Sequence, residues 1–305
     1  MDNAPERLYS WGKLVAPRGS KESAEGMNEV DWVGLWRELS ERLRRPEVAG
    51  EERRADRWRE RAQGFDAAVK RKKERSDPLL DFVVGRLHQG DTALDIGAGT
   101  GSFAIPMARV ARRVTAVEPS QSMAAILREN AAAQGLVNID LVEARWEDTE
   151  VEPHDVAVCS HAMYSSPDLV GFVGKMERSA RSTCFLLMRV PSHDGIIGEI
   201  SRRIYGQPHD SPNFVVGYNV LHGMGIYANV MMEPVERFWA DDSLDDALVR
   251  AKRHLRLGNG TAHDDTIREL LAQRLTFREG QYHWPDGMRS ALVWWDTSRP
   301  GSPRP

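Results

Sequence analysis

Three glycines at alternate positions form the strongest chemical signal in the sequence. They lie in LDIGAGTG, residues 94–101, where a short apolar run meets the start of an expected helix. Glycine lets the backbone turn sharply and leaves no Cβ between the main chain and a ligand. The free N–H groups at the start of the following helix would also face that ligand. The segment therefore predicts a strand, a turn and a helix that together bind a ligand.

An acidic residue, Glu118, ends the next apolar run, in VTAVEPS over residues 114–120. A carboxylate at the tip of a second strand is placed to accept hydrogen bonds from two ribose hydroxyls. Alone, Glu118 is equally compatible with a surface residue that caps the next helix. Its distance from the glycine turn favours the ribose-binding interpretation.

A dinucleotide-binding fingerprint, G-x-G-x-x-G, is the competing interpretation of the glycine turn. That pattern requires its third glycine at position 102, which is Ser102, whereas this chain has Gly101. Pyrophosphate binding also leaves the polar Asp95 at the strand end unexplained. A nicotinamide-dependent enzyme is therefore the weaker alternative.

The segments LDIGAGTG and VTAVEPSQSM resemble motifs one and two of the class I S-adenosylmethionine-dependent methyltransferases. They are most similar to the small-molecule branch typified by the ubiquinone/menaquinone-biosynthesis methyltransferases. The resemblance spans roughly residues 58–190 and implies S-adenosyl-L-methionine as cofactor, with S-adenosyl-L-homocysteine as product. It says nothing about the substrate.

The resemblance implies a cofactor site in which each matching residue has a place. Asp95, Gly97 and Gly99 would line the methionine end, with Gly101 opening the helix beside it. Glu118 would hold the ribose. The full set of implied cofactor-binding residues is Asp95, Gly97, Ala98, Gly99, Gly101, Glu118, Pro119, Ser120, Met123, Arg145, Trp146 and Ser160.

The segment after the third predicted strand, EARWED over residues 143–148, departs from the family pattern. The family usually has Gly-Asp-Ala there, and its aspartate meets the adenine amino group. Ala144 occupies that place in this chain. Arg145 and Trp146 are two replacements, through backbone N–H groups and ring packing, and the alternative is that Trp146 covers the sheet edge.

The resemblance places the loop after the fourth predicted strand, in DVAVCSHAMY over residues 155–164, next to the transferred methyl. His161 follows that strand and titrates near neutrality, so it is predicted to be the base for an oxygen or nitrogen acceptor. The alternative is a histidine that holds its loop by hydrogen bonds. Tyr164 is predicted to orient the acceptor.

His222 is the third candidate catalytic residue, and it comes from a stretch without charged residues between Ser211 and Met232. This stretch is interpreted either as a buried helix followed by a core strand or as the wall of a pocket. Convergence of His222 and Tyr227 with His161 on one cavity would favour a small-molecule acceptor.

No metal site is expected. His209-Asp210 and His263-Asp264-Asp265 match the spacing of no closed zinc site, and the fourth strand offers no carboxylates at its rim. Cys159 and Cys184 lie in neighbouring predicted strands and are interpreted as buried thiols.

The elements that must position these residues alternate between strand and helix. Strands are predicted at 92–96, 113–117, 139–142, 155–160, 183–190, 228–235 and 290–296. Helices are predicted at 31–45, 51–75, 78–87, 103–111, 122–134, 169–180, 196–205, within 213–224, at 243–257 and at 264–277. This order predicts an α/β fold, a doubly wound, seven-stranded, mostly parallel sheet whose last strand runs antiparallel beside 228–237.

The predicted organisation has four parts. They are a flexible arm over 1–30, an N-terminal helical cap over 31–90, a methyltransferase domain over 91–297 and a disordered tail over 298–305. A helical lid is expected as an insertion at about 191–225. Trp294 and Trp295 would face opposite sides of the last strand, one in the core and one outside, at a partner interface.

Composition limits the classes of partner. With 41% hydrophobic and 28% charged residues the 305-residue chain is neither disordered nor a membrane protein, and two cysteines suit a reduced, cytoplasmic setting. The net charge of -4 argues against a broad nucleic-acid footprint, and the run RKKER at 71–75 is interpreted as a solvated helix face. We expect methyl transfer to a small molecule by SN2 displacement, with no nucleic acid, no membrane and a possible homodimer. A non-catalytic cofactor-binding regulator and an RNA or protein methyltransferase are the alternatives.

Overall fold

The computed structural model describes residues 30–43, 58–59, 61–73, 77–233, 239–258, 260–285 and 289–297. The chain divides into two units, residues 1–31 and 32–305, and only Val30 and Asp31 of the first are described. All elements below belong to the second unit. The predicted tail over 298–305 and nearly all of the predicted arm over 1–30 lie outside the described residues.

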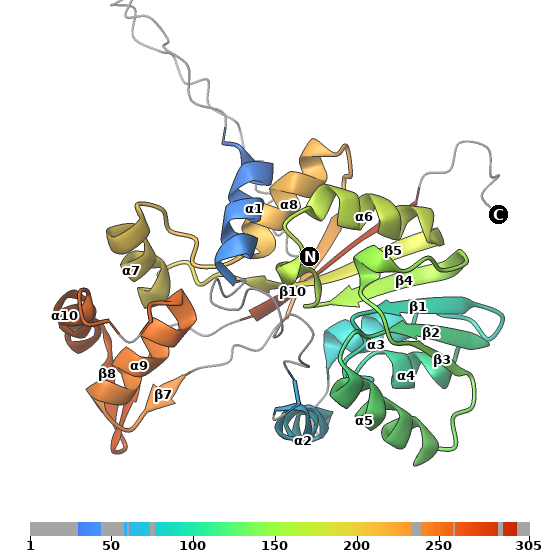
Figure 1. The fold of residues 1–305 in the computed structure, drawn as a ribbon, viewed down its shortest axis with the longest axis horizontal. Coiled ribbons are helices and arrows are strands. Elements are labelled where there is room, and N and C mark those ends of the chain that lie inside the picture. Colours follow the sequence, from blue (N-terminus) through green and yellow to red (C-terminus); the bar gives the residue numbers. More distant parts are fainter. Residues whose placement is uncertain are drawn as a thin grey trace, which may run out of the picture. The chain divides into compact units, whose positions relative to one another are not determined.

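A seven-stranded sheet forms the centre of the second unit (Figure 1). Its strands are β1 (Thr92–Ile96), β2 (Arg113–Val117), β3 (Ile139–Val142), β4 (His154–Ser160), β5 (Ala180–Val190), β6 (Asn229–Met232) and β10 (Arg289–Asp296). They lie in the order β3-β2-β1-β4-β5-β10-β6, and only β10 runs antiparallel to its neighbours. The predicted doubly wound, mostly parallel sheet is confirmed, as is the antiparallel pairing of the last strand.

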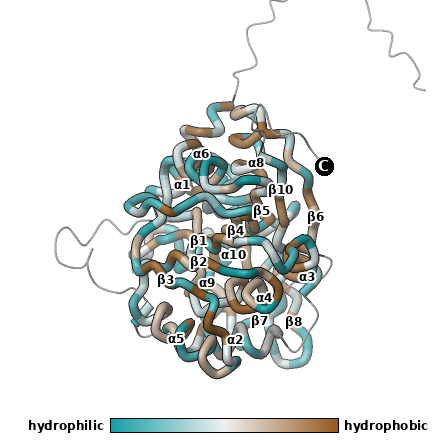
Figure 2. Tube along the Cα trace, turned by 90° about the vertical axis from the view of Figure 1, so that its right-hand side faces the viewer, coloured by the Kyte–Doolittle hydropathy of each residue, from teal (hydrophilic) through white to brown (hydrophobic). Residues whose placement is uncertain are grey.

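Helices cover both faces of this sheet, which explains why its central strands read as continuous apolar runs (Figures 1 and 2). One face carries α1 (Trp32–Leu43), α6 (Leu169–Arg178) and α8 (Phe214–Gly223), whose apolar side chains join one core. The other carries α3 (Pro78–Val84), α4 (Ala104–Ala108) and α5 (Gln121–Ala132), which join a second core. All five residues of β1 are buried between them.

Local signals in the sequence explain where several helices begin. Asp77 caps α3 by accepting a hydrogen bond from the Leu80 N–H, and Pro78 takes the first helical position, as predicted. Ser120 caps α5 by accepting from the Met123 N–H at 3.1 Å. The second cap fixes the chain that directly follows β2, and so the side chain of Glu118.

The two tryptophans of β10 are both covered. Trp295 lies in the core under α6 and donates its indole N–H to Glu177 at 3.0 Å. Trp294 packs on Phe82 of α3, with 4.6 Å between ring centroids. The expectation that one ring lies outside at a partner interface is therefore wrong, because α3 occupies that face of the sheet.

The two cysteines are buried and unpaired, as expected. Cys159 and Cys184 lie in the neighbouring strands β4 and β5, and burial raises the pKa of both thiols. Their thiols are inert packing groups rather than nucleophiles.

A third core joins α7 (Ile196–Tyr205), α9 (Leu244–Leu255) and α10 (Asp264–Arg274). A three-stranded antiparallel sheet adjoins these helices, formed by β7 (Ala240–Asp241), β9 (Gln281–His283) and β8 (Thr276–Arg278). This small sheet was not predicted. The helix predicted over 264–277 ends at Arg274, because 276–278 pairs as a strand.

The segment predicted as one lid at about 191–225 contributes to two different cores. Its helix α7 packs on α9 and α10, whereas α8 packs on α1, α6 and β5. Of the predicted helix at 51–75, the structure describes α2 (Ala62–Lys73), which packs on α5. Within the described residues, no helix has the length and apolar character needed to cross a membrane.

Candidate active site

The glycine turn after β1 has the conformation that its sequence predicts. Gly97, Gly99 and Gly101 have φ of 75°, 56° and 94°, a region that side-chain-bearing residues rarely adopt. The N–H groups of Gly97 and Ala98 donate to the Val117 carbonyl at 2.8 and 3.1 Å. A Cβ at Gly97 would lie 2.2 Å from the Cβ of Ala162. The turn is therefore tied to β2 and pressed against the loop after β4.

Glu118 is held in place by this turn. Its Oε2 accepts from the Gly99 N–H and its Oε1 from the Ser120 N–H, both at 2.8 Å. The side chain is only 6% exposed. The two backbone N–H groups thus fix the orientation of the carboxylate beside the turn. Pro119 is exposed, and Met123 packs in the core beneath the first turn of α5.

Asp95 is a buried carboxyl group with an unsatisfied oxygen. It is 1% exposed, and its Oδ2 and the nearby Thr100 Oγ1 have no hydrogen-bond partner within the described part of the chain. Burial raises the pKa of Asp95 to about 7; an N–H from Ala104 opposes the rise and the charge of Glu118 adds to it. Such a group is satisfied by a positively charged or hydrogen-bonding ligand.

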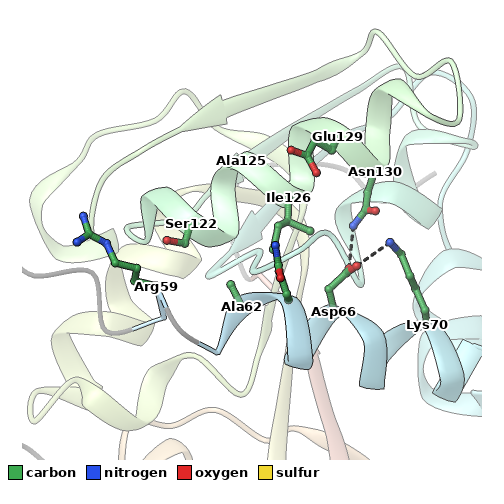
Figure 3. A pocket seen from close by; sticks show the side chains of 10 residues that line it. Arg59, Ala62, Asp66, Lys70, Ser122, Ala125, Ile126, Glu129 and Asn130 are labelled. Atoms are coloured by element: carbon green, nitrogen blue, oxygen red, sulfur yellow. Dashed lines mark hydrogen bonds and ion pairs between the residues drawn. The ribbon is translucent and has the colours of Figure 1, made fainter.

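Helix α2 lies beside α5, and the groove between them is drawn in Figure 3. Asp66 of α2 accepts from the Asn130 side-chain N–H at 2.9 Å and pairs with Lys70 at 2.6 Å. Burial raises the pKa of Asp66, but these two partners lower it below its ordinary value. The same Asn130 amide donates to the Thr100 carbonyl at 3.1 Å. One amide group thus links α2 to the glycine turn.

This link places an aromatic ring over the open side of the turn. A Cβ built on Gly99 would meet only the ring of Phe65, at 3.9 Å. Trp58 packs against that ring, with 5.3 Å between centroids. Sequence reasoning missed Phe65 and Asn130 as site residues, because a phenylalanine and an asparagine on helix faces carry no distinctive spacing.

The side chains of the segment after β3 are engaged with other parts of the protein. Trp146 is buried, donates its indole N–H to the Phe172 carbonyl at 3.4 Å and lies under Lys175 of α6. The Arg145 side chain points to acidic neighbours at 3.6 Å. The Trp146 ring is packed against Phe172 and Lys175, so little of it is exposed for packing on an adenine. Its covering of the sheet is the alternative that the geometry favours.

The loop after β4 holds two of the three predicted catalytic residues together. Ser160 ends β4, and His161 follows with φ of 57° and donates its N–H to the Leu187 carbonyl. Its Nδ1 lies 2.9 Å from the Tyr164 hydroxyl, which accepts the Arg189 backbone N–H at 2.6 Å. The short 3₁₀ helix η2 (Met163–Ser165) carries Tyr164.

The ring of His161 contacts two hydroxyl groups. The Tyr164 hydroxyl accepts from the Arg189 N–H and also contacts Nδ1, and burial raises the pKa of Tyr164 to about 12. Nε2 faces Ser290 Oγ at 3.3 Å. Both ring nitrogens are engaged, which favours the alternative of a histidine that holds its loop.

The structure does not bring His222 to this loop. In register, Ser290 of β10 faces Arg189, whereas Trp294 faces Phe185 and Asn229. His222 and Tyr227 precede Asn229, and Tyr227 is 81% exposed. They therefore lie beyond the amino end of β6, at the edge of the sheet opposite to His161. His222 and Tyr227 thus do not converge with His161 on one cavity, so this support for a small-molecule acceptor is missing.

The site residues fit the cofactor that the resemblance implies. The turn leaves the side of Gly99 open, the Glu118 carboxylate is oriented beside it, and Oδ2 of the buried Asp95 has no donor among the described residues. A ligand with a ribose and a cationic end satisfies these groups, whereas a pyrophosphate would meet two carboxyl groups.

Comparison with known proteins agrees with this geometry. Residues 93–183 match the family described as "Methyltransferase domain". The YcgJ protein from Bacillus subtilis has the same fold, with a TM-score of 0.50 at 13% identity, covering 73% of this chain and 99% of that one. An uncharacterized protein of Haemophilus influenzae is 26% identical over 220 residues, 68% of this chain and 77% of that protein.

A mitochondrial ribosomal RNA small subunit methyltransferase of Arabidopsis thaliana is 28% identical over 136 residues, which are 44% of this chain and 33% of that protein. The chain thus spans only a third of this relative. The matched domain contains both β1 with its glycine turn and the loop after β4. Residues 93–183 of this chain thus form a methyltransferase domain.

Proposed function

We propose that this methyltransferase transfers the methyl group to a small-molecule acceptor. The observation that carries the proposal is the close cover on the loop after β4. Trp36 of α1 is fully buried and donates its indole N–H to the Ser166 carbonyl at 2.9 Å. The Trp36 ring lies 6.4 Å from the Tyr164 ring. The Arg189 guanidinium lies 5.3 Å from the same Tyr164 ring. Such packing leaves room for a small acceptor at this rim.

The glycine turn and its neighbours are our proposed cofactor site. Asp95, Gly97, Gly99 and Gly101 would hold the methionine end, and Glu118 the ribose. S-adenosylmethionine supplies a methyl on a positively charged sulfur, which is already activated toward a nucleophile. The remaining task of the chain is to align the acceptor and exclude water.

We assign His161 and Tyr164 positioning roles. The hydroxyl of Tyr164 joins the loop after β4 to the backbone of β5, through Arg189. His161 extends this row of contacts to Ser290 of β10. The row spans the ends of three adjacent strands, so it fixes the wall against which an acceptor would lie. His222 has no part in this proposal.

The alternative acceptor is RNA, which is supported by the name of the Arabidopsis relative. A chain that binds the cofactor without catalysis is the third possibility. The acceptor class is tested by incubating the enzyme with radiolabelled S-adenosylmethionine and a cell extract separated by size. We expect label in the low-molecular-weight fraction, in compounds small enough for a ligand pocket. Label that is confined to RNA and lost on ribonuclease treatment would overturn the proposal.

Cofactor binding is tested first and separately, by calorimetric titration with S-adenosylmethionine and S-adenosylhomocysteine. Binding without transfer to either fraction of the extract would favour the non-catalytic alternative. No binding at all would contradict the proposed site.

A further inference from the structure

We propose that the cavity at the end of β5 is the acceptor site, and that it takes an uncharged one-ring aromatic compound carrying a hydroxyl or N–H donor. This inference rests on the proposed function, since it names the class of acceptor for the same reaction. The cavity is lined by Arg189, Val190, Pro191, Ser192, Gly195, Ile196, Ile197, Gly198, Pro208, Asp210, Ser211, Asn213, Trp239, His254, Trp284 and Pro285.

The cavity adjoins the proposed methyl-transfer rim through one residue. Arg189 lines the cavity, and its own backbone N–H donates to the Tyr164 hydroxyl. Its guanidinium lies over the Tyr164 ring, and its register partner in β10 is Ser290. A ring seated in the cavity would therefore have one end next to the row of Tyr164, His161 and Ser290.

The volume of the cavity limits the size of the acceptor. It measures about 80 Å³, and a site for one water needs at least about 10–15 Å³ by this kind of measure. The cavity thus has room for about five to eight water-sized groups, which suits a single six-membered ring with a short substituent. It does not suit a fused polycycle.

The cavity lining offers a hydrogen-bond acceptor. Asp210 accepts at Oδ2 from His254 Nε2 at 2.5 Å and from Ser211 Oγ at 3.1 Å. Among the described residues, no other residue donates to its Oδ1. Burial raises the pKa of Asp210, but His254 and Arg189 lower it below the ordinary value, so the group stays ionised. A hydroxyl or N–H of the ligand would complete its hydrogen bonding.

The charges around Asp210 argue for an uncharged ligand. The carboxylate already has the Arg189 guanidinium and the His254 imidazole as neighbours in the cavity lining. A cationic ligand would add a charge that this balance does not require, and an anionic ligand would lie against the carboxylate. A neutral donor meets the need of Asp210 without either cost.

Two indole rings give the cavity rigid aromatic walls. Trp284 is 4% exposed and donates its indole N–H to Asp241 at 2.7 Å. Trp239 stands at 87° to it, with 5.4 Å between ring centroids, and Arg250 covers the Trp239 ring. Rings fixed in this way bind a planar ligand with little loss of side-chain freedom.

The test compares ring compounds by ligand-observed NMR titration of the full chain. Phenol and aniline are the probes that carry a donor. Anisole lacks the donor, benzylammonium is a cation and benzoate is an anion. We expect phenol and aniline to compete with each other for one site. The other three should bind at least about tenfold more weakly, as the loss of a hydrogen bond to a charged group predicts.

Variants locate the binding. Asp210→Asn is expected to weaken phenol about tenfold and leave benzene unchanged, whereas the matched control Asp242→Asn, at an exposed position, changes neither. Trp239→Phe provides a second variant, expected to weaken every ring probe, should Asp210→Asn fail to fold. Equal binding of phenol and anisole, or phenol binding unaffected by both cavity variants, would overturn the inference.

The same samples are titrated with S-adenosylmethionine, which separates the two proposals. Cofactor binding without phenol binding removes the acceptor assignment and leaves the proposed function standing. Absence of cofactor binding contradicts the proposed function itself.

Discussion

The two halves of the proposed site, for cofactor and for acceptor, are built in different ways. The cofactor half comes from neighbouring segments, the glycine turn after β1 and Glu118 after β2, and most of its contacts are made by backbone N–H groups. The acceptor half collects side chains that lie far apart in the chain, such as Tyr164, Asp210 and His254. Backbone geometry thus fixes the first half, whereas the packing of distant elements fixes the second.

This difference suggests that changes in one half can leave the other intact. The two halves touch at one close contact, where Gly97 faces Ala162 of the loop after β4. Substitutions at that contact should damage both halves, and substitutions away from it should damage one.

The largest effect is expected for Gly97→Ala. The new Cβ would lie 2.2 Å from that of Ala162, at a φ of 75°. Strain and overlap together should lower the free energy of unfolding by about 2–4 kcal/mol and abolish cofactor binding. Denaturant unfolding and calorimetry measure the two effects.

Gly135→Ala is the matched control for this change. Gly135 also has positive φ, at 67°, but a Cβ there has no atom within 4 Å. It should cost only about 1–2 kcal/mol of stability and leave cofactor affinity unchanged. Equal effects of the two substitutions would show that the contact with Ala162 has no special role.

Glu118→Ala should weaken the cofactor half alone. It removes the acceptor of the Gly99 and Ser120 N–H groups as well as the proposed ribose contact. We expect S-adenosylmethionine affinity to fall at least about tenfold, or about 1.4 kcal/mol, in calorimetry. Glu129→Ala, at an exposed position on α5, is the control. A parallel loss of phenol binding would contradict the independence of the halves.

The pH dependence of cofactor binding should report Asp95. Its pKa of about 7 in the folded protein lies above the ordinary 3.8. Between these pH values the folded protein keeps a proton on Asp95 that the unfolded chain releases. Its contribution to stability is therefore present at low pH and is lost as the pH rises through 7. A cationic ligand favours the ionised form, so affinity should rise by up to about tenfold per pH unit below 7.

Asp95→Asn should remove this dependence. Titrations between about pH 5 and 8 in matched buffers measure it, over the range in which a group of this pKa changes charge. Affinity that falls as the pH rises toward 7, or a dependence that survives in the variant, would rule out Asp95 as its source.

Tyr164→Phe should affect the acceptor half alone. It leaves the Arg189 N–H without an acceptor and removes the contact of the hydroxyl with His161 Nδ1. We expect turnover to fall by about tenfold or less, with cofactor affinity unchanged, as the loss of one buried hydrogen-bond partner predicts. Tyr227→Phe, at the opposite edge and 81% exposed, is the control. A loss of cofactor affinity in Tyr164→Phe would show that the halves are coupled there.

The smallest effect is expected for Asn130→Ala, which cuts the link between α2 and the glycine turn. Cofactor affinity should fall about two- to fivefold, the value of one neutral hydrogen bond, as measured by calorimetry. Asn219→Ala on α8 removes a helix asparagine that contacts only its own helix and serves as control. Unchanged affinity would mean that α2 needs no such link.

Much of the fold could be predicted from the sequence because its signals are local. The strands β1, β2 and β3 have the predicted bounds. In β1, burial of every residue demands an unbroken apolar run. The small sheet escaped prediction, because β7 has two residues and β8 and β9 have three each, too few to show a period. The predicted strand over 228–235 was also too long, since β6 ends at Met232.

The site divides in the same way. The glycine turn and Glu118 stand out because backbone conformation restricts residue type, and the restriction is visible in the sequence. Nothing in the sequence pairs Asp210 with His254, 44 positions later, since only tertiary packing brings them together. Trp146 and His222 were predicted at the site for a related reason. Proximity in sequence to a predicted rim does not determine which way a side chain points.

The position of β10 has a consequence for the synthesis of this protein. Strand β10 lies between β5 and β6, and Thr183 bonds to Asp296, 113 residues later, so this ladder forms only after β10 is synthesised. Until β10 leaves the ribosome, β5 presents an unpaired apolar edge, which is a template for aggregation. Nascent chains should therefore depend on chaperones late in translation, and stalling before residue 289 should yield insoluble product.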